Sequence, residues 1–205
     1  ESVKVLGLVN ITVLAAGSIF TGSVHEPIKG TKNPQKMLQT GIPFTKKPVA
    51  LQFDYKVKMS DRENRIRATG FSKITDVPGK DYPAAILLLQ KRWEDANGNV
   101  YAKRIGTMVT YYYHSTDWKN NVTYEIMYGD ITNRPEYKAH MMRLQATESY
   151  TVNSKGESVP IHEVAWGDEN DVPTHMYIQF TSSHGGAYIG SPGNTLWVDN
   201  VKLVY

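Results

Sequence analysis

The chain has 205 residues, a formal net charge of +3 and no cysteine. Without cysteine, thiolate catalysis, disulfides and cysteine-ligated zinc are excluded, and the scattered lysines and arginines argue against a nucleic-acid partner. The aromatic residues are thirteen tyrosines, four tryptophans and five phenylalanines, so most carry a polar group, which suits half-buried strand faces and surfaces that contact sugars.

The chain begins at Glu1-Ser2 without an initiator methionine, and a strand pattern follows from Val3 to Leu8. We therefore expect a single domain over residues 1–205 that forms the C-terminal part of a longer protein. No apolar run approaches the ~20 residues of a membrane-spanning helix. The stretch from Gly22 to Pro48 holds four prolines and is predicted to be an extended surface connection.

Strand patterns fill the middle of the chain. Val49 to Val57 alternates apolar and polar residues, which predicts a strand with one buried face. Ala84 to Gln90 is a continuous apolar run, which predicts a strand buried on both faces. It turns at Asp95 to Asn99, where Asn-Gly favours a hairpin, and returns from Val100 towards Tyr113. A further strand is expected at Val122 to Met127.

The second half has fewer clear signals. Glu136 to Ala146 has apolar spacings of three and four, which fit a helix, although a strand would also fit. Asn153 to Pro173 is rich in charge and turn residues and is predicted to be a loop. Met176 to Thr181 is another strand. Many short strands with at most one helix predict an all-β sandwich of two packed antiparallel sheets.

The last strand contains a parity change. Leu196 and Val198 point to one face, whereas Val201, Leu203 and Tyr205 fall on the opposite parity. One extra residue near Asp199-Asn200, a β-bulge, would return all five to one buried face. We interpret Trp197 on this strand as structural. The glycine-rich segment Ser182 to Asn194 is interpreted as a tight connection between core strands, so we expect the functional site elsewhere.

Four segments in order along the chain resemble the Bacteroidetes "putative carbohydrate metabolism domain" family. They are Ala15–Gly22 (AAGSIFTG), Gly41–Phe44 with Lys47-Pro48, Ile86–Trp93, and Ser182–Val201 with its LWVDNV ending. The resemblance implies a jelly-roll β-sandwich, export to the outer membrane or cell surface, and a part in glycan handling alongside other outer-membrane glycan-uptake proteins. It implies no particular catalytic residues.

Glycoside hydrolysis needs two carboxyl groups on either side of the scissile bond. Glu94-Asp95 lies at the Asn-Gly turn, where local backbone hydrogen bonds explain it, and Asp168 to Asp171 fits a solvated loop. A polysaccharide lyase would need a tyrosine, a histidine and a cation around a uronic acid, and Tyr111, Tyr113, His114 and Arg104 are the available set. The six histidines never occur at paired zinc-ligand spacings.

Sugar binding without catalysis needs flat aromatic rings with polar neighbours. In Tyr111-Tyr112-Tyr113, the first and third rings share one sheet face. Trp118 is expected in a polar loop, Trp166 in an exposed acidic loop, and Trp93 beside the hairpin. These five residues, Tyr111, Tyr113, Trp118, Trp166 and Trp93, are the predicted ligand contacts.

Asp199 is the candidate metal ligand. Related jelly-roll modules often hold a structural calcium with an aspartate in the last strand, and the resemblance extends that expectation to this chain. The alternative is an aspartate that caps the bulge. No other cofactor is expected.

Together with what the family resemblance implies, these patterns lead us to expect a non-catalytic carbohydrate-binding or accessory module of a bacterial glycan-utilisation system, exported to the cell surface, with a polysaccharide or oligosaccharide as its partner. One alternative is a glycoside hydrolase or polysaccharide lyase with an unrecognised catalytic site. A second is a structural or adhesion domain that packs on a partner protein, which would present a flat apolar patch.

Overall fold

The computed structural model describes residues 2–5, 9–24, 33–70, 73–141 and 143–205. These residues form one 3-10 turn, η1 (Pro34–Met37), and a series of strands. The strands are β1 (Ser2–Val5), β2 (Val9–Thr12), β3 (Ser18–Phe20), β4 (Gly22–Val24), β5 (Leu38–Thr40), β6 (Ile42–Pro43), β7 (Ala50–Lys58), β8 (Arg65–Arg67), β9 (Thr75–Val77), β10 (Ala84–Glu94), β11 (Val100–Tyr111), β12 (Thr116–Glu125), β13 (Met127–Tyr128), β14 (Tyr150–Val152), β15 (Ser158–Trp166), β16 (His175–Thr181), β17 (Ile189–Gly190) and β18 (Thr195–Val204). Among these residues, no helix is long and apolar enough to cross a membrane.

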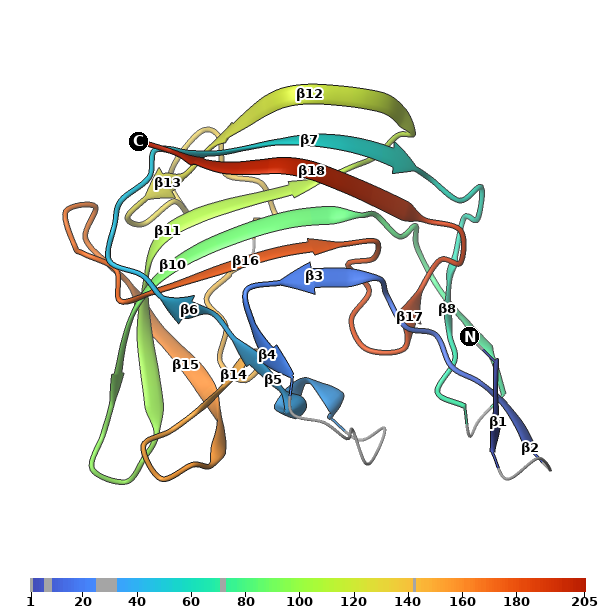
Figure 1. Ribbon diagram of the computed structural model, residues 1–205, viewed down its shortest axis with the longest axis horizontal. Coiled ribbons are helices and arrows are strands. Elements are labelled where there is room, and N and C mark those ends of the chain that lie inside the picture. Colours follow the sequence, from blue (N-terminus) through green and yellow to red (C-terminus); the bar gives the residue numbers. More distant parts are fainter. Residues whose placement is uncertain (1, 6–8, 25–32, 71–72, 142) are drawn as a thin grey trace.

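Two layers form the upper half of the molecule (Figure 1). The antiparallel sheet β12-β7-β18 lies over the central strands β3, β16, β10 and β11. Alternate residues of each strand meet between the layers, and Leu51 and Phe53 of β7 pack with Leu87 of β10 and Phe180 of β16. All four are at most 7% exposed, so this interface is the main hydrophobic core. The predicted all-β jelly-roll sandwich is confirmed.

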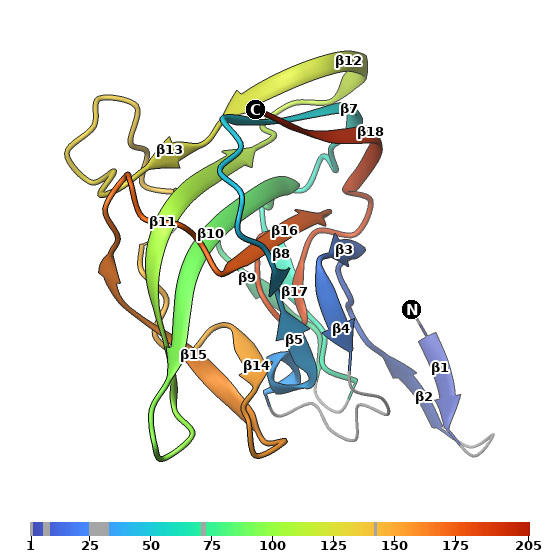
Figure 2. The same ribbon diagram turned by 60° about the vertical axis from the view of Figure 1, so that its left-hand side comes forward.

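The lower half nearly closes into a barrel (Figures 1 and 2). β10 and β11 continue past a bulge between Leu89 and Gln90, and the sheet then runs β11-β15-β14-β5-β4. Because β3 and β4 are separated by one residue, Thr21, the two ends of this sheet meet. Thr21 N donates to Ile178 O of β16, and its carbonyl accepts from Gly41 N. Two pairs, β11-β15 and β14-β5, are parallel, so the prediction of purely antiparallel sheets is wrong there.

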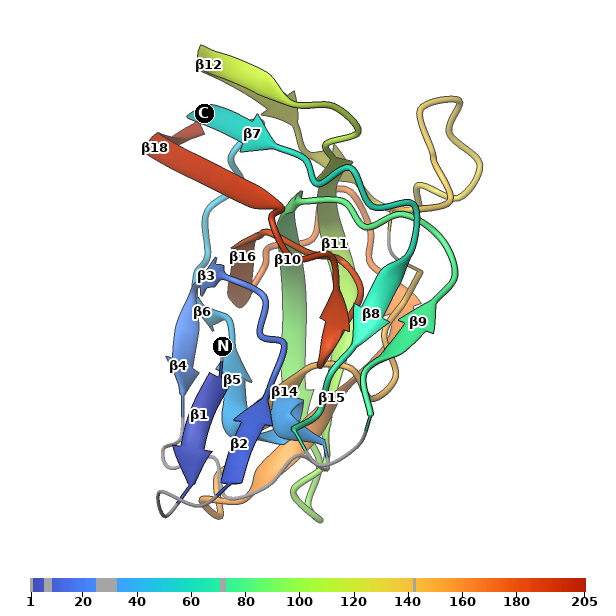
Figure 3. The same ribbon diagram turned by 90° about the vertical axis from the view of Figure 1, so that its right-hand side faces the viewer.

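Two small sheets lie on the side of the molecule that is on the right in Figure 1 and faces the viewer in Figure 3. β8 lies between β17 and β9, and β1 pairs with β2. β17 belongs to the glycine-rich segment between β16 and β18, so its pairing with β8 holds the second half of that segment in place.

The strands predicted from alternation and from the long apolar run are confirmed as β7, β10, β11 and β16. Three predictions are wrong. The described part of Glu136–Ala146 is neither helix nor strand; Asn153–Pro173 contains β14's hairpin partner β15; and Gly22–Pro48 contains β4, β5 and β6 rather than a plain connection. β15 was missed because Glu163 points inward, which breaks the apolar alternation. The predicted strand at Val3–Leu8 is described only as far as Val5, in β1.

The bulge predicted in the last strand is confirmed. Asp199 pairs with Asp54 and Lys202 with Gln52, so one extra residue is accommodated, and Asn200 has φ 52°. Leu196, Val198 and Leu203 return to the core. Val201 and Tyr205 are 46% and 64% exposed, so the prediction that all five share a buried face is wrong for these two, because Val201 is part of the bulge and Tyr205 follows the strand.

A buried polar network fills the lower barrel. Arg104 and Glu163 form an ion pair, and their side chains are 0% and 1% exposed. Glu163 also accepts hydrogen bonds from Gln90 Nε2 at 2.6 Å and from Gln145 N at 2.7 Å. Arg92 extends the network by donating to Gln90 Oε1 and to Thr40 O. Every charge in this interior therefore has a partner, which burial requires.

His175 borders this network and should make stability depend on pH. Burial, and then the charge of Arg92, lower the pKa of His175 to about 4. The ring is thus neutral when folded but protonates near pH 6.5 when unfolded, so stability is full above that pH and falls as pH drops towards 4. We expect a loss of about 1–2 kcal/mol after allowing for the partial exposure of the ring.

Urea unfolding at pH 7, 6, 5 and 4 measures this dependence. In His175→Gln the part of the slope due to this residue should disappear, whereas His162→Gln, on the outer side of β15, should keep it. An unchanged slope in His175→Gln would show that His175 does not titrate abnormally.

Candidate functional site

The central strands have a second face, which looks away from β12-β7-β18. Ile86 and Leu88 of β10, Val109 of β11 and Tyr177 of β16 form an apolar cluster here, and we call it the inner face. Phe20, Tyr111 and Met141 pack against it. At the edge where β10 begins and β11 and β16 end, the inner face gives way to aromatic rings.

These rings form a closed group that we call the five-ring cluster: Tyr82, Tyr111, Tyr113, His140 and His184. Tyr111 lies 4.8 Å from both His140 and His184 between ring centroids. His184 stacks on Tyr82 at 5.5 Å, and Tyr82 meets Tyr113 edge-on at 4.7 Å. Tyr113 completes the circle through a 3.3 Å contact between its hydroxyl and His140 Nδ1. Tyr82 and Tyr111 also stack on one another at 6.4 Å, so each ring touches at least two others.

Strand order explains how distant residues meet here. Tyr111 ends β11, and Tyr113, two residues on, lies on the same side, as predicted, whereas Tyr112 between them is buried in the main core. Tyr82 precedes β10 and His184 follows β16. Because β10 is antiparallel to both neighbours, its start lies beside their ends. His140 comes from the segment between β13 and β14.

Asp81 holds the glycine-rich segment against this edge. Its carboxylate is 0% exposed and accepts hydrogen bonds from His184 N at 3.2 Å and from Ser191 N at 2.9 Å. Burial alone would raise the pKa of Asp81, but hydrogen bonds from His184, Ser183 and Ser191 hold it below its ordinary value. Gly185 allows the tight path, because a Cβ there would lie 2.6 Å from Ile189 O.

The same carboxylate orients the His184 ring. Asp81 Oδ1 lies 3.1 Å from His184 Nδ1. The Tyr82 backbone N–H donates a hydrogen bond to the same Nδ1 at 3.0 Å. Nε2 is a hydrogen-bond acceptor in the tautomer whose Nδ1–H faces Asp81, and a donor in the tautomer whose Nδ1 accepts from Tyr82. In both tautomers Nε2 is the ring nitrogen available to a ligand.

The pKa shifts of His140 and Tyr111 both favour the neutral form of the side chain. Burial lowers the pKa of His140, with Lys138 adding to the effect and a hydrogen bond to Val109 opposing it. Burial, then Tyr113 and Asp81, raise the pKa of Tyr111. Tyr113 is the most accessible tyrosine of the group, at 48% exposed. The cluster thus offers ring faces, hydroxyl groups and one imidazole nitrogen to a ligand.

The other predicted contacts do not join Tyr111 and Tyr113. Trp93 stacks on Tyr101 at 5.9 Å on the outer side of the lower barrel. Trp118 lies in strand β12, not in a polar loop, and is 47% exposed. Trp166 ends β15 and is half-buried, with the Arg104 guanidinium 5.5 Å from its ring, so the prediction of an exposed loop residue is wrong. The five predicted residues are therefore spread over several surfaces.

Of the residues named for a possible polysaccharide lyase, Arg104 is not available to a substrate. Arg104 lies wholly inside the lower barrel, paired with Glu163, and has no exposed side chain to offer a substrate. Asp199 accepts a hydrogen bond from Asn200 N at 2.7 Å, which is the bulge-capping role. In the described ranges, no group of three or more acidic, histidine or cysteine residues could hold a metal ion, and structural calcium stays a prediction.

Sequence reasoning missed Asp81, Tyr82, His140 and His184. It also interpreted Ser182–Asn194 as a mere connection, whereas this segment supplies His184 to the cluster. The available signal was an Asp-Tyr-Pro triplet just before the strongest strand pattern and a His-Gly-Gly triplet just after a strand. Neither triplet is specific enough to identify its partner without the fold.

The fold and this edge define a jelly-roll sandwich domain with an aromatic site at one end of its central sheet. The chain belongs to the family described as "Putative carbohydrate metabolism domain", which matches residues 1–204 and confirms the resemblance seen in the sequence.

The solved structures that resemble the chain include two from Bacteroides. One is a "putative glycoside hydrolase" from Bacteroides thetaiotaomicron VPI-5482, 19% identical, with a TM-score of 0.52, covering 93% of this chain and 47% of that one. The other is a "putative glycoside hydrolase" from Bacteroides vulgatus ATCC 8482, 15% identical, with a TM-score of 0.49, covering 93% and 64%. The chain spans about half the length of the first, and that likeness supports the fold alone. No curated protein matches.

Proposed function

We propose that the five-ring cluster binds carbohydrate, and that the protein is a non-catalytic carbohydrate-binding or accessory module of a bacterial glycan-utilisation system. The observation that carries the proposal is the closed arrangement of Tyr82, Tyr111, Tyr113, His140 and His184 beside the inner face. The family description supports the same class of ligand.

The binding mode follows from the geometry. The exposed Tyr113 ring offers a flat surface on which the C–H face of a pyranose can stack. Tyrosine hydroxyls and His184 Nε2 exchange hydrogen bonds with sugar hydroxyls, and Asp81 keeps the imidazole in place. The surface is shallow, so we expect dissociation constants of roughly 10 μM to 1 mM.

Tyr113→Ala should weaken glycan binding about tenfold, because it removes a stacking contact worth about 1.4 kcal/mol. Isothermal titration against a panel of neutral plant, host and microbial oligosaccharides measures this, with Tyr205→Ala as the matched control. Tyr205 is 64% exposed at the end of the opposite layer, so its loss should leave affinity unchanged. Failure of the whole panel to bind, or wild-type affinity in Tyr113→Ala, would count against the proposal.

Export to the cell surface is part of the proposal. A surface module of this kind would work beside other outer-membrane glycan-uptake proteins, delivering bound polysaccharide to them. Support comes from the family membership, because the resemblance to that family implies export.

A second candidate function is proton abstraction from a uronic acid, favoured by the Asp81–His184 pair. His184 Nε2 would take the C5 proton; the released electron pair would form a C4=C5 double bond, and the C4–O bond would break, with a tyrosine hydroxyl protonating the leaving oxygen. Hydrolysis would need a second carboxyl group opposite Asp81, whose oxygens are already engaged. None of the five rings carries a permanent positive charge to neutralise a uronate, so binding is the first proposal.

The same panel, extended to uronate polysaccharides, separates the two functions. Binding without products supports the accessory role. Ultraviolet absorbance from an unsaturated product, abolished in His184→Gln, would instead establish lyase activity and overturn the non-catalytic assignment.

A further inference from the structure

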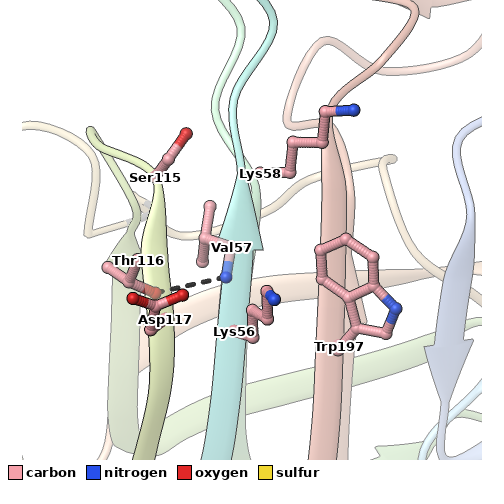
Figure 4. A pocket seen from close by; sticks show the side chains of 7 residues that line it. All are labelled: Lys56, Val57, Lys58, Ser115, Thr116, Asp117 and Trp197. Carbon is pink, nitrogen blue, oxygen red and sulfur yellow. Dashed lines mark hydrogen bonds between the residues drawn. The ribbon is translucent and has the colours of Figure 1, made fainter.

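A second aromatic surface lies on the opposite side of the molecule from the inner face. It is the outward face of β12-β7-β18, where a pocket of about 410 Å³ is lined by Lys56, Val57, Lys58, Ser115, Thr116, Asp117 and Trp197 (Figure 4). We call it the Trp197 pocket. Trp197 was interpreted from the sequence as structural, yet its side chain is 40% exposed.

Strand register places the main groups in one row. Trp197 of β18 pairs directly with Lys56 of β7, and Thr116 of β12 pairs with Val57, which brings Asp117 to the other side of Lys56. Lys56 Nζ lies 5.7 Å from the centre of the Trp197 ring, a cation–π distance. Figure 4 shows Asp117, Lys56 and Trp197 side by side, with Lys58 further along the sheet.

The two lysines have no acidic partner within 4.0 Å among the residues described. A lysine ammonium group without an acidic partner is either hydrated or available to bind an anionic ligand. Here the two lysines stand beside an aromatic ring on a flat sheet, which adds an apolar surface to the positive charge. That pairing suits a ring-shaped ligand bearing an acidic group.

The hydroxyl groups of the pocket point to the same conclusion. Thr116 Oγ1 accepts a hydrogen bond from Val57 N at 3.2 Å, and Ser115 Oγ accepts one from Met59 N at 2.9 Å. Each hydroxyl therefore keeps its own proton to donate. With the two ammonium groups, donors outnumber the single carboxylate acceptor, Asp117, so the ligand must supply most of the acceptor oxygens.

We propose that the Trp197 pocket binds an acidic sugar residue, carrying a carboxylate or a sulfate ester, within a polysaccharide chain. The pyranose ring stacks on Trp197, the acidic group lies between Lys56 and Lys58, and Asp117 accepts a ring hydroxyl. This site is independent of the five-ring cluster and would give the domain a second, charge-selective contact with its glycan. Two weak sites on one chain raise the overall affinity for a long polysaccharide.

Titration with an oligogalacturonate tests the carboxylate form, and titration with a sulfated galacto-oligosaccharide tests the sulfate form. The methyl-esterified oligogalacturonate is the uncharged control with the same ring. We expect Lys56→Gln/Lys58→Gln and Trp197→Ala each to weaken binding of the acidic probe at least tenfold. The methyl ester should bind the wild type as weakly as the acidic probe binds these variants. Binding should also fall as salt rises.

Two control variants keep the test specific. Lys36→Gln/Lys103→Gln removes the same charge from other surfaces and should bind the acidic probe normally. Tyr113→Ala should also bind it normally, so failure of the five-ring proposal does not affect this one. The proposal would be overturned if the Lys56→Gln/Lys58→Gln variant bound the acidic probe with wild-type affinity, or if the wild type bound the methyl ester as tightly as the acidic probe. Failure of both acidic probes to bind the wild type would also overturn it.

Discussion

Glu163→Gln should lower the free energy of unfolding by about 3–5 kcal/mol, the largest stability effect expected from a single polar substitution here. The Glu163 carboxylate lies at the centre of the lower barrel and accepts hydrogen bonds from the Arg104 and Gln90 side chains and from the backbone N–H of Gln145. A glutamine would leave the Arg104 charge without its counterion in a space that water does not reach, and its amide nitrogen would face donors. Urea unfolding monitored by circular dichroism measures the change.

The exposed pair of Lys80 and Glu63, whose nitrogen and oxygen are 3.0 Å apart, provides the control. Glu63→Gln should change stability little, because water screens that pair. The double variant Arg104→Met/Glu163→Leu should regain much of what Glu163→Gln loses, since it removes both buried charges together. A cost for Glu163→Gln no larger than that for Glu63→Gln would refute the buried network as a source of stability.

Asp81→Ala should lower the free energy of unfolding by about 2–4 kcal/mol and should also abolish glycan binding at the five-ring cluster. The substitution leaves the backbone N–H groups of His184 and Ser191 without an acceptor and releases the His184 ring. Since hydrogen bonds hold the pKa of Asp81 below its ordinary value, the folded carboxylate resists protonation more than the unfolded one. The cost should therefore be full at neutral pH and shrink as pH falls below about 4.

Urea unfolding at pH 7 and pH 3, together with titration of the glycan identified for the wild type, measures both effects. Asp76→Ala removes a carboxylate that is 74% exposed and should affect neither. Retention of normal glycan affinity in a folded Asp81→Ala protein would show that the orientation of His184 does not matter for binding.

Those two residues also mark what the sequence could and could not predict. Alternation in Val49–Val57 and the apolar run at Ala84–Gln90 predicted the core correctly, because burial of one or both strand faces leaves a direct periodic pattern. β15 has no such pattern, since its inward Glu163 is satisfied by Arg104 from another strand. From the sequence alone, the two residues of a buried ion pair cannot be distinguished from charged surface residues, because only the fold shows that they are paired.

Only part of the candidate site was predicted from the sequence, again because some of its features are local and others depend on the fold. Tyr111 and Tyr113 were correctly placed on one face, because their spacing of two is a local property. Their partners Tyr82, His140 and His184 come from three other segments, so strand order rather than spacing decides that they meet. The prediction of a loop at Trp118 is wrong because β12 is an exposed edge strand, and its polar sequence therefore lacks the apolar alternation of a core strand.

The central claim is that glycan binds at the five-ring cluster. The most direct measurement is the nuclear magnetic resonance shift of aromatic and imidazole ring protons as the panel's best-binding neutral oligosaccharide is added. We expect the rings of Tyr82, Tyr113 and His184 to shift in proportion to occupancy, while those of Trp93 and Trp118 stay in place. Saturable binding that shifts Trp93 or Trp118 and leaves the cluster unchanged would contradict the account.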